Sequence, residues 1–172
     1  MHMQDAIESR RETMNDQNLT YTFTVDQTPE EAYAAINNVR GWWSGEIDGG
    51  TAKLGDEFTY RYQDVHYSKQ RITELIPGKK VVWLVLDSYL KFIQDKTEWN
   101  GTQVVFEVSK KGNKTEIRFT HQGLVPEVEC FGACSNAWAF YFNGSLRSLI
   151  TTGKGEPNQK EKEPGEKRNQ SN

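Results

Sequence analysis

Residues 126–150 read PEVECFGACSNAWAFYFNGSLRSLI, and this stretch decides the fold that the sequence predicts. One set of its residues recurs at spacings of three and four: Glu127, Phe131, Cys134, Trp138, Phe142, Ser145 and Leu149. Such a period is typical of one face of an α-helix. Pro126 suits a first helical turn and Gly153 suits the end of the helix. Because three large aromatic side chains on one face need a broad partner surface, we expect this long helix to pack against a sheet.

The chain between residues 57 and 121 predicts that sheet. Apolar and polar residues alternate over 57–62, 102–108 and 115–120, as in strands with one covered and one solvated face. The run VVWLVL at 81–86 is apolar on both faces, so this strand should be central. Turn-forming residues such as Pro77-Gly78 predict short connections between consecutive strands.

The N-terminal half predicts one strand and two short helices. Residues 19–26 alternate as a strand, and Thr28, Pro29 and Glu31 form the sequence signature of a capping box at a helix start. A second short helix or turn is expected near residues 40–44. The predicted fold is therefore α+β, with a curved antiparallel sheet of six to seven strands around a long C-terminal helix and two short helices after the first strand.

Length and composition predict a single domain with polar ends. The 172 residues favour one domain over 18–153. We expect residues 1–17 to form a polar arm. Residues 154–172 contain no Val, Ile, Leu, Met or aromatic residue, so we expect a disordered charged tail.

Several classes of function are disfavoured by composition and motifs. A net charge of −3 and few basic residues among the strand aromatics argue against nucleic acid as a partner. Without an apolar run of eighteen residues or a signal peptide, we expect no membrane partner and a cytoplasmic protein. The sequence shows neither a phosphate-binding glycine motif nor metal-ligand spacing, so we predict no cofactor and no metal. Cys130 and Cys134 are expected to be buried free thiols.

The aromatic residues leave two alternatives open, a solid core or the lining of an apolar pocket. Aromatic walls with a few polar groups are the usual anatomy of a small-molecule site. We expect His121, at the end of a strand, to lie near the pocket mouth as a polar anchor. The predicted ligand-binding residues are Trp42, Trp43, Tyr60, Tyr62, Trp83, Phe106, His121, Phe131, Trp138 and Phe142.

Residues suited to acid–base catalysis are scattered along the sequence. The candidates are His66, His121, Glu74 and Glu98, of which no two are adjacent, and no nucleophile motif is present. We therefore predict no catalytic residue. Phe140 falls on the outer side of the predicted helix, where it could contact another protein.

Several motifs in this order resemble the activator of heat shock protein 90 ATPase-like branch of the START/Bet v-like superfamily, which has the helix-grip fold. They are TPEEAY at 28–33, WWSGEI at 42–47, TELIPG at 73–78, EWNGT at 98–102, HQGL at 121–124 and the stretch 130–150. The resemblance covers about residues 18–153. It implies an apolar cavity between the last helix and the sheet, which in this superfamily holds lipids, sterols or polyketides.

Three functions are compatible with these expectations. The first is a START-like domain that binds an apolar or aromatic small molecule in that cavity. The second is a cyclase- or dehydratase-type enzyme that uses the same cavity, with His121 or Glu74 as acid or base. The third is a chaperone-associated protein-interaction module with an exposed apolar patch, which we place between residues 89 and 99.

Overall fold

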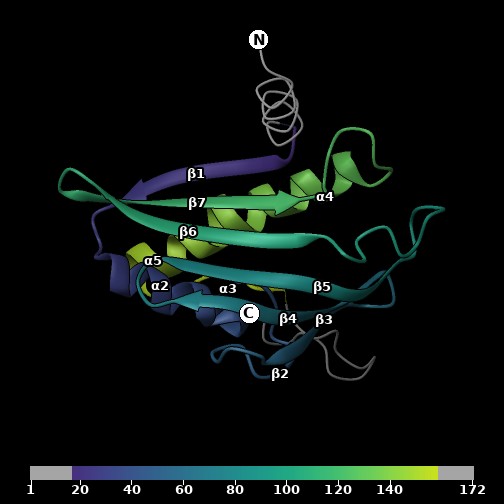
Figure 1. Ribbon diagram of the computed structural model, residues 1–172, viewed down its shortest axis with the longest axis horizontal. Coiled ribbons are helices and arrows are strands. Elements are labelled where there is room, and N and C mark those ends of the chain that lie inside the picture. The colour runs from purple at the N-terminus through teal and green to yellow at the C-terminus, as the bar shows by residue number, and fades with distance from the viewer. Residues whose placement is uncertain (1–16, 159–172) are drawn as a thin grey trace, which may run out of the picture.

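The computed structural model describes residues 17–158, which form one antiparallel sheet covered on one face by helices (Figure 1). The strands, in chain order, are β1 (Leu19–Val25), β2 (Asp48–Gly49), β3 (Glu57–Tyr62), β4 (His66–Ile76), β5 (Lys80–Leu90), β6 (Gln103–Lys111) and β7 (Lys114–Gln122). The helical segments are α2 (Pro29–Asn37), α3 (Val39–Trp42), α4 (Phe131–Trp138), η1 (Ala139–Leu146) and α5 (Arg147–Thr152). The predicted α+β helix-grip arrangement with seven strands is confirmed.

The sheet has the spatial order β1-β7-β6-β5-β4-β3-β2, so every neighbouring pair from β2 to β7 is consecutive in the chain. The first strand, β1, pairs with the last, β7, with Leu19 opposite His121 and Val25 opposite Thr115. The pairing of β4 with β5 shifts register at two places, between Lys69 and Gln70 and between Ile72 and Glu74. Such irregularities bend a strand and increase its twist, which curves the sheet around the C-terminal helix.

Helix α2 begins with the predicted capping box. The backbone N–H of Glu31 donates to Thr28 Oγ1 over 3.1 Å, and the N–H of Thr28 donates to Glu31 Oε1 over 2.9 Å. Pro29 occupies the first helical turn. Two backbone donors that the helix itself cannot satisfy are thereby paired, which fixes where the helix starts.

The C-terminal helix differs from the prediction at its start and in its middle. It begins at Phe131 and not at Pro126, because the Glu98 carboxylate accepts the backbone N–H groups of Glu129 and Cys130 (2.6 and 3.0 Å) and holds the preceding residues in turns. The segment η1 is a π-helix, whose wider turn changes which residues face the sheet. The helix ends at Gly153 with a φ of 85°, as its position in the sequence predicted.

A solid aromatic core fills the space between the middle of the sheet and the helices. Four predicted pocket residues belong to this core and are fully buried: Trp42, Trp83, Phe106 and Phe142. The Trp42 ring stacks on that of Trp83 (centroids 6.2 Å apart) and meets Phe106 edge-on (5.8 Å). These four residues therefore belong to the close-packed core and do not line the pocket described below, which corrects their prediction as ligand contacts.

The ends of the described chain differ from the predicted domain boundaries. The predicted arm and tail lie outside the described residues, except for residue 17 and residues 154–158. These last five residues pack against the domain: Glu156 N–H donates to Ser145 Oγ (2.7 Å), and Asn158 N–H donates to the Trp43 carbonyl (3.1 Å). In the part of the chain that the structure describes, no helix is long and apolar enough to cross a membrane.

Candidate ligand pocket

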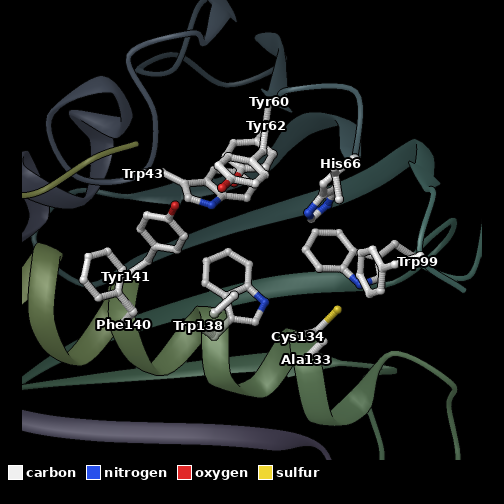
Figure 2. A pocket seen from close by; sticks show the side chains of 13 residues that line it. Trp43, Tyr60, Tyr62, His66, Trp99, Ala133, Cys134, Trp138, Phe140 and Tyr141 are labelled. Atoms are coloured by element: carbon white, nitrogen blue, oxygen red, sulfur yellow. The ribbon is translucent and has the colours of Figure 1, made fainter. Parts of the chain in front are cut away.

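One pocket, with a volume of about 350 Å³, opens between the start of the C-terminal helix and the sheet end formed by β3, β4 and the loop after β5 (Figure 2). A volume of this size lies at the lower end of the range of small-molecule sites. Thirteen described residues line it: Trp43, Tyr60, Tyr62, Val65, His66, Phe92, Trp99, Ala133, Cys134, Ala137, Trp138, Phe140 and Tyr141.

Stacked aromatic rings form the walls. The rings of Trp43 and Tyr60 stack with centroids 4.0 Å apart and planes 9° apart. Trp138 stacks on Trp43 (5.1 Å) and, on its other side, on Trp99 (6.1 Å, 10°). Each ring is held by a neighbouring ring, so the walls have little freedom to collapse into the space.

Two local sequence patterns leave the space open. In the hairpin of β3 and β4, the register places Tyr62 opposite His66, and the tight turn contains Gln63 with a φ of 51°. On helix α4, Ala133 and Ala137 are one turn apart and face the pocket beside Trp138. Their methyl groups occupy little of the volume that larger side chains on this helical face would fill.

The pocket lining is uncharged. None of the thirteen described lining residues carries a carboxylate, an ammonium or a guanidinium group, and apolar atoms make up most of the exposed lining. A charged ligand would lose its hydration here without gaining an ion pair. The pocket is therefore suited to a neutral molecule.

A chain of three hydrogen bonds outside the pocket lining connects two of its wall residues, Trp138 and Trp99. Trp138 Nε1–H donates to His121 Nδ1 (3.1 Å), His121 Nε2 lies 2.9 Å from Thr102 Oγ1, and Thr102 Oγ1–H donates to the Trp99 carbonyl (2.7 Å). Since the indole can only donate and the Thr102 hydroxyl proton is committed, His121 must carry its proton on Nε2. Burial, followed by the nearby His66, lowers the pKa of His121 to about 3, so it is neutral.

His121 is consequently not at the pocket mouth, where the sequence led us to expect it. Its side chain is completely buried and is absent from the pocket lining. Both ring nitrogens are engaged, so His121 has no free position for a substrate or a proton. Its role in the structure is to position Trp138 and the loop that carries Trp99.

Asn158 lies outside the pocket lining and connects two residues that belong to it. Its Nδ2 donates to Tyr60 Oη (3.0 Å) and Tyr141 Oη (3.3 Å), and its Oδ1 accepts from Ser44 Oγ (2.6 Å). Its backbone also forms a parallel bridge with Ser44. One side chain from the C-terminal end of the described chain thus joins two lining tyrosines from the sheet and the helix.

Two buried polar atoms in the lining lack a strong partner. His66 Nε2 makes no hydrogen bond, and the Trp99 Nε1–H meets only the weakly accepting sulfur of Cys134. The two rings meet edge to face, with centroids 4.6 Å apart and planes at 88°. Burial lowers the pKa of His66 to about 4, so its ring is neutral near pH 7.

Sequence comparison places the chain that forms this pocket in a known family. Residues 26–151 match the Activator of Hsp90 ATPase homolog 1-like protein family. The chain belongs to this family. The match spans nearly all elements that build the pocket, from α2 to α5. No functionally curated protein matches the sequence significantly.

Solved structures include relatives of this family member across most of its length. The Aha1 dimer from Colwellia psychrerythraea is 26% identical, with a TM-score of 0.65, and the match covers 80% of this chain and 98% of that one. The protein SSP2350 from Staphylococcus saprophyticus is 13% identical (TM-score 0.61; 83% and 98% covered). DynU16, from the dynemicin biosynthetic locus, is 14% identical (TM-score 0.61; 84% and 51% covered). The last two likenesses show the shared fold.

In this family member, the predicted site residues fall into four groups. Trp43, Tyr60, Tyr62 and Trp138 line the pocket, and their contact with a ligand stays a prediction. The core holds Trp42, Trp83, Phe106 and Phe142, while His121 stands behind the wall. Phe131 is half-buried against the core and does not line the pocket.

Several lining residues were not among the predicted ligand contacts. His66 was considered only as an acid–base candidate, and Trp99 as part of the EWNGT motif and of the expected exposed patch at 89–99. Trp99 is in fact buried. Cys134 was assigned to the buried face of the helix. This assignment could have identified it as a lining residue, because it lies one turn before Trp138. Phe140 was predicted to be exposed, and at 49% exposure it is, but it stands at the pocket rim.

Proposed function

We propose that the protein binds a small apolar molecule containing a ring in the pocket between α4, η1 and the β3–β4 end of the sheet. The observation that carries the proposal is an uncharged space of about 350 Å³ with walls of stacked tryptophan and tyrosine rings. Flat aromatic walls favour a flat ligand, because stacked or edge-on ring contacts contribute beyond simple burial.

Hydrogen bonds behind the pocket walls indicate that the protein keeps this space open. The protein uses His121 and Asn158 to hold lining residues from three different elements, although a solid core would need neither. Elsewhere in the core, aromatic rings such as those of Trp42, Trp83 and Phe106 pack directly against one another. An apolar space of this size that stays unfilled costs stability, so its preservation favours a ligand.

Native mass spectrometry of freshly purified protein tests the proposal, because a co-purified ligand adds mass. Quenching of tryptophan fluorescence by added naphthalene gives an affinity, since three tryptophans line the pocket. We expect saturable binding that Ala137→Phe weakens at least tenfold by filling the mouth. Asn136→Phe places the same ring on the neighbouring exposed position outside the lining and serves as the matched control. Quenching without saturation, or equal affinity in both variants, would contradict the proposal.

The structure gives the cyclase- or dehydratase-type alternative no acid–base residue in the expected place. Glu74 lies at the surface, where its carboxylate is 3.5 Å from Lys80 Nζ. His121 is neutral and has both ring nitrogens bonded. We therefore assign no catalytic step to either residue.

A protein contact at the pocket mouth is a second candidate function. Tyr62, Phe92 and Phe140 line the rim and are 39%, 46% and 49% exposed, so three aromatic side chains face solvent around one opening. Exposed apolar groups gathered in this way are common at interaction sites. Membership of this family suggests a chaperone of the Hsp90 class as the partner. Titration of the purified chaperone with the wild type and with Phe140→Ser tests this, and a wild type without signal would remove the candidate.

A further inference from the structure

We propose that the pocket selects a neutral aromatic compound that carries a hydroxyl group, and that His66 binds this hydroxyl. This inference rests on the function proposed above and specifies its ligand. It follows from an inventory of the polar atoms in the lining, from the lack of lining charge, and from the chemistry of a neutral imidazole.

Most polar groups of the pocket wall are already satisfied by the protein. Trp138 Nε1 is bonded to His121, and the hydroxyls of Tyr60 and Tyr141 are bonded to Asn158. A ligand would gain little by competing for these groups. Among the described lining residues, His66 Nε2 is buried without any partner, and the Trp99 Nε1–H meets only the sulfur of Cys134, a weak acceptor. A buried polar atom without a partner costs about 1–3 kcal/mol, and a ligand that supplies the partner recovers it.

The rings that carry these two nitrogens, those of His66 and Trp99, are in direct contact at one end of the pocket. The centroids of His66 and Trp99 are 4.6 Å apart, and Figure 2 shows both residues at the same end of the pocket. Because their planes are perpendicular, neither nitrogen is hydrogen-bonded to the other ring's nitrogen. Trp43 and Tyr141 lie farther from His66, and the Tyr60 ring meets His66 edge-on with centroids 5.0 Å apart. The pocket lining therefore contains an unpaired imidazole nitrogen at His66, whereas the hydroxyls of Tyr60 and Tyr141 are paired with Asn158.

The strand that carries His66 remains polar as it enters the core. Ser68 and Gln70 follow at alternate positions of β4, so they share the inward face with His66. Both are completely buried, and Ser68 Oγ and Gln70 Oε1 lack partners. A strand that served only packing would carry apolar residues here. Ser68 and Gln70 do not line the pocket, so on this face of β4 the polar side chain that a ligand can meet is that of His66.

The chemistry of the two nitrogens favours a hydroxyl over other oxygen groups. A neutral imidazole either donates or accepts at Nε2, depending on its tautomer, and a hydroxyl can bond to both forms. A carbonyl or ether oxygen can only accept. Trp99 Nε1 is a donor only, and a hydroxyl oxygen suits it as well. A carboxylate is disfavoured because no cationic side chain lines the pocket.

The test compares three ligands of the same ring size by tryptophan quenching: naphthalene, 2-naphthol and 2-naphthoate. In the wild type we expect 2-naphthol to bind five- to tenfold more tightly than naphthalene, the size expected of one hydrogen bond. We expect 2-naphthoate to bind at least tenfold more weakly than 2-naphthol. In His66→Phe, the preference for 2-naphthol should fall to about onefold, with naphthalene affinity unchanged within about twofold.

Two further variants separate His66 from its surroundings. Trp99→Phe keeps a ring and removes the indole N–H, so the naphthol preference should fall only in part. Tyr89→Phe removes an exposed hydroxyl outside the pocket lining and should leave the preference unchanged. The thermal unfolding of each variant is measured first. If His66→Phe does not fold, the three-ligand comparison in the wild type decides alone.

The outcomes distinguish this inference from the function on which it rests. Equal wild-type affinity for naphthalene and 2-naphthol, or an unchanged preference in a folded His66→Phe, overturns the role of His66 and leaves the binding function standing. Tight binding of 2-naphthoate overturns the neutrality of the ligand. Failure of all three compounds to bind overturns the proposed function itself.

Discussion

Trp138 Nε1 donates a hydrogen bond to His121 Nδ1 over 3.1 Å in the buried interior. This bond joins the C-terminal helix to strand β7 and fixes the plane of an indole that forms the pocket wall. It also requires an unprotonated Nδ1, so it ties the wall of the pocket to the charge state of a histidine.

Replacing His121 should destabilise the protein strongly. His121→Leu leaves the buried Trp138 N–H without an acceptor and removes the donor to Thr102. We expect a loss of about 2–4 kcal/mol in the free energy of unfolding, measured by urea denaturation. Gln122→Leu changes the exposed neighbour on β7 and should cost less than about 0.5 kcal/mol. A similar loss in both variants would refute the buried hydrogen-bond chain.

Stability should fall on mild acidification. The pKa of His121 is about 3 in the folded protein and about 6.5 in the unfolded chain, so between these values only the unfolded state binds the proton. The stabilisation is fully present above pH 6.5 and is lost as the pH falls, by about 1.4 kcal/mol per pH unit at most. His66 adds to this effect, but less, because burial lowers its pKa only to about 4.

Urea titrations between pH 7.5 and 5 measure this loss, above the range in which the carboxyl groups titrate. In His121→Leu the slope should decrease by about 1 kcal/mol per pH unit, since the largest contribution has been removed. An identical slope in wild type and variant would show that His121 is not the group responsible.

Asn158 should couple the C-terminal end of the described chain to the pocket. Asn158→Ala removes its three side-chain hydrogen bonds to Ser44, Tyr60 and Tyr141. We expect a loss of about 1–2 kcal/mol in unfolding free energy, because these groups are partly buried. Glu156→Ala keeps its backbone bond to Ser145 and serves as the control. If Asn158→Ala is as stable as this control, the Asn158 contacts contribute nothing.

Two glycines should respond to alanine with opposite sign. A Cβ at Gly155 would lie 2.3 Å from the Gly41 carbonyl oxygen, so Gly155→Ala should lower the melting temperature by several degrees. A Cβ at Gly132, in α4, meets nothing within 4 Å. Gly132→Ala should therefore stabilise by about 0.5–1 kcal/mol through the helix propensity of alanine. Differential scanning calorimetry compares both variants, and a neutral Gly155→Ala would contradict the close approach.

The pattern of the sequence was sufficient to predict the fold and the start of α2. Alternation over 57–62 and 115–120 identified real strands, and the capping box of Thr28 and Glu31 is present as predicted. These features are local, because a strand or a cap is determined by residues close together in the chain.

The start of the last helix was mispredicted because it depends on a distant residue. Glu98 is about thirty positions away from the backbone groups of Glu129 and Cys130 that it binds. The π-helical turns of η1 likewise broke the regular period on which the predicted face was based. Neither effect leaves a signal within the helix sequence itself.

The sequence by itself determined that a long aromatic-faced helix would meet a curved sheet. Only the tertiary structure decided which aromatic side chains close-pack as core, as Trp83 does, and which border a pocket, as Trp43 does. The core aromatics and the pocket aromatics are the same residue types, and they occur in the same kind of sequence pattern. They differ in the small neighbours Ala133 and Ala137 and in hydrogen bonds from residues far along the chain, and such contacts exist only once the chain has folded.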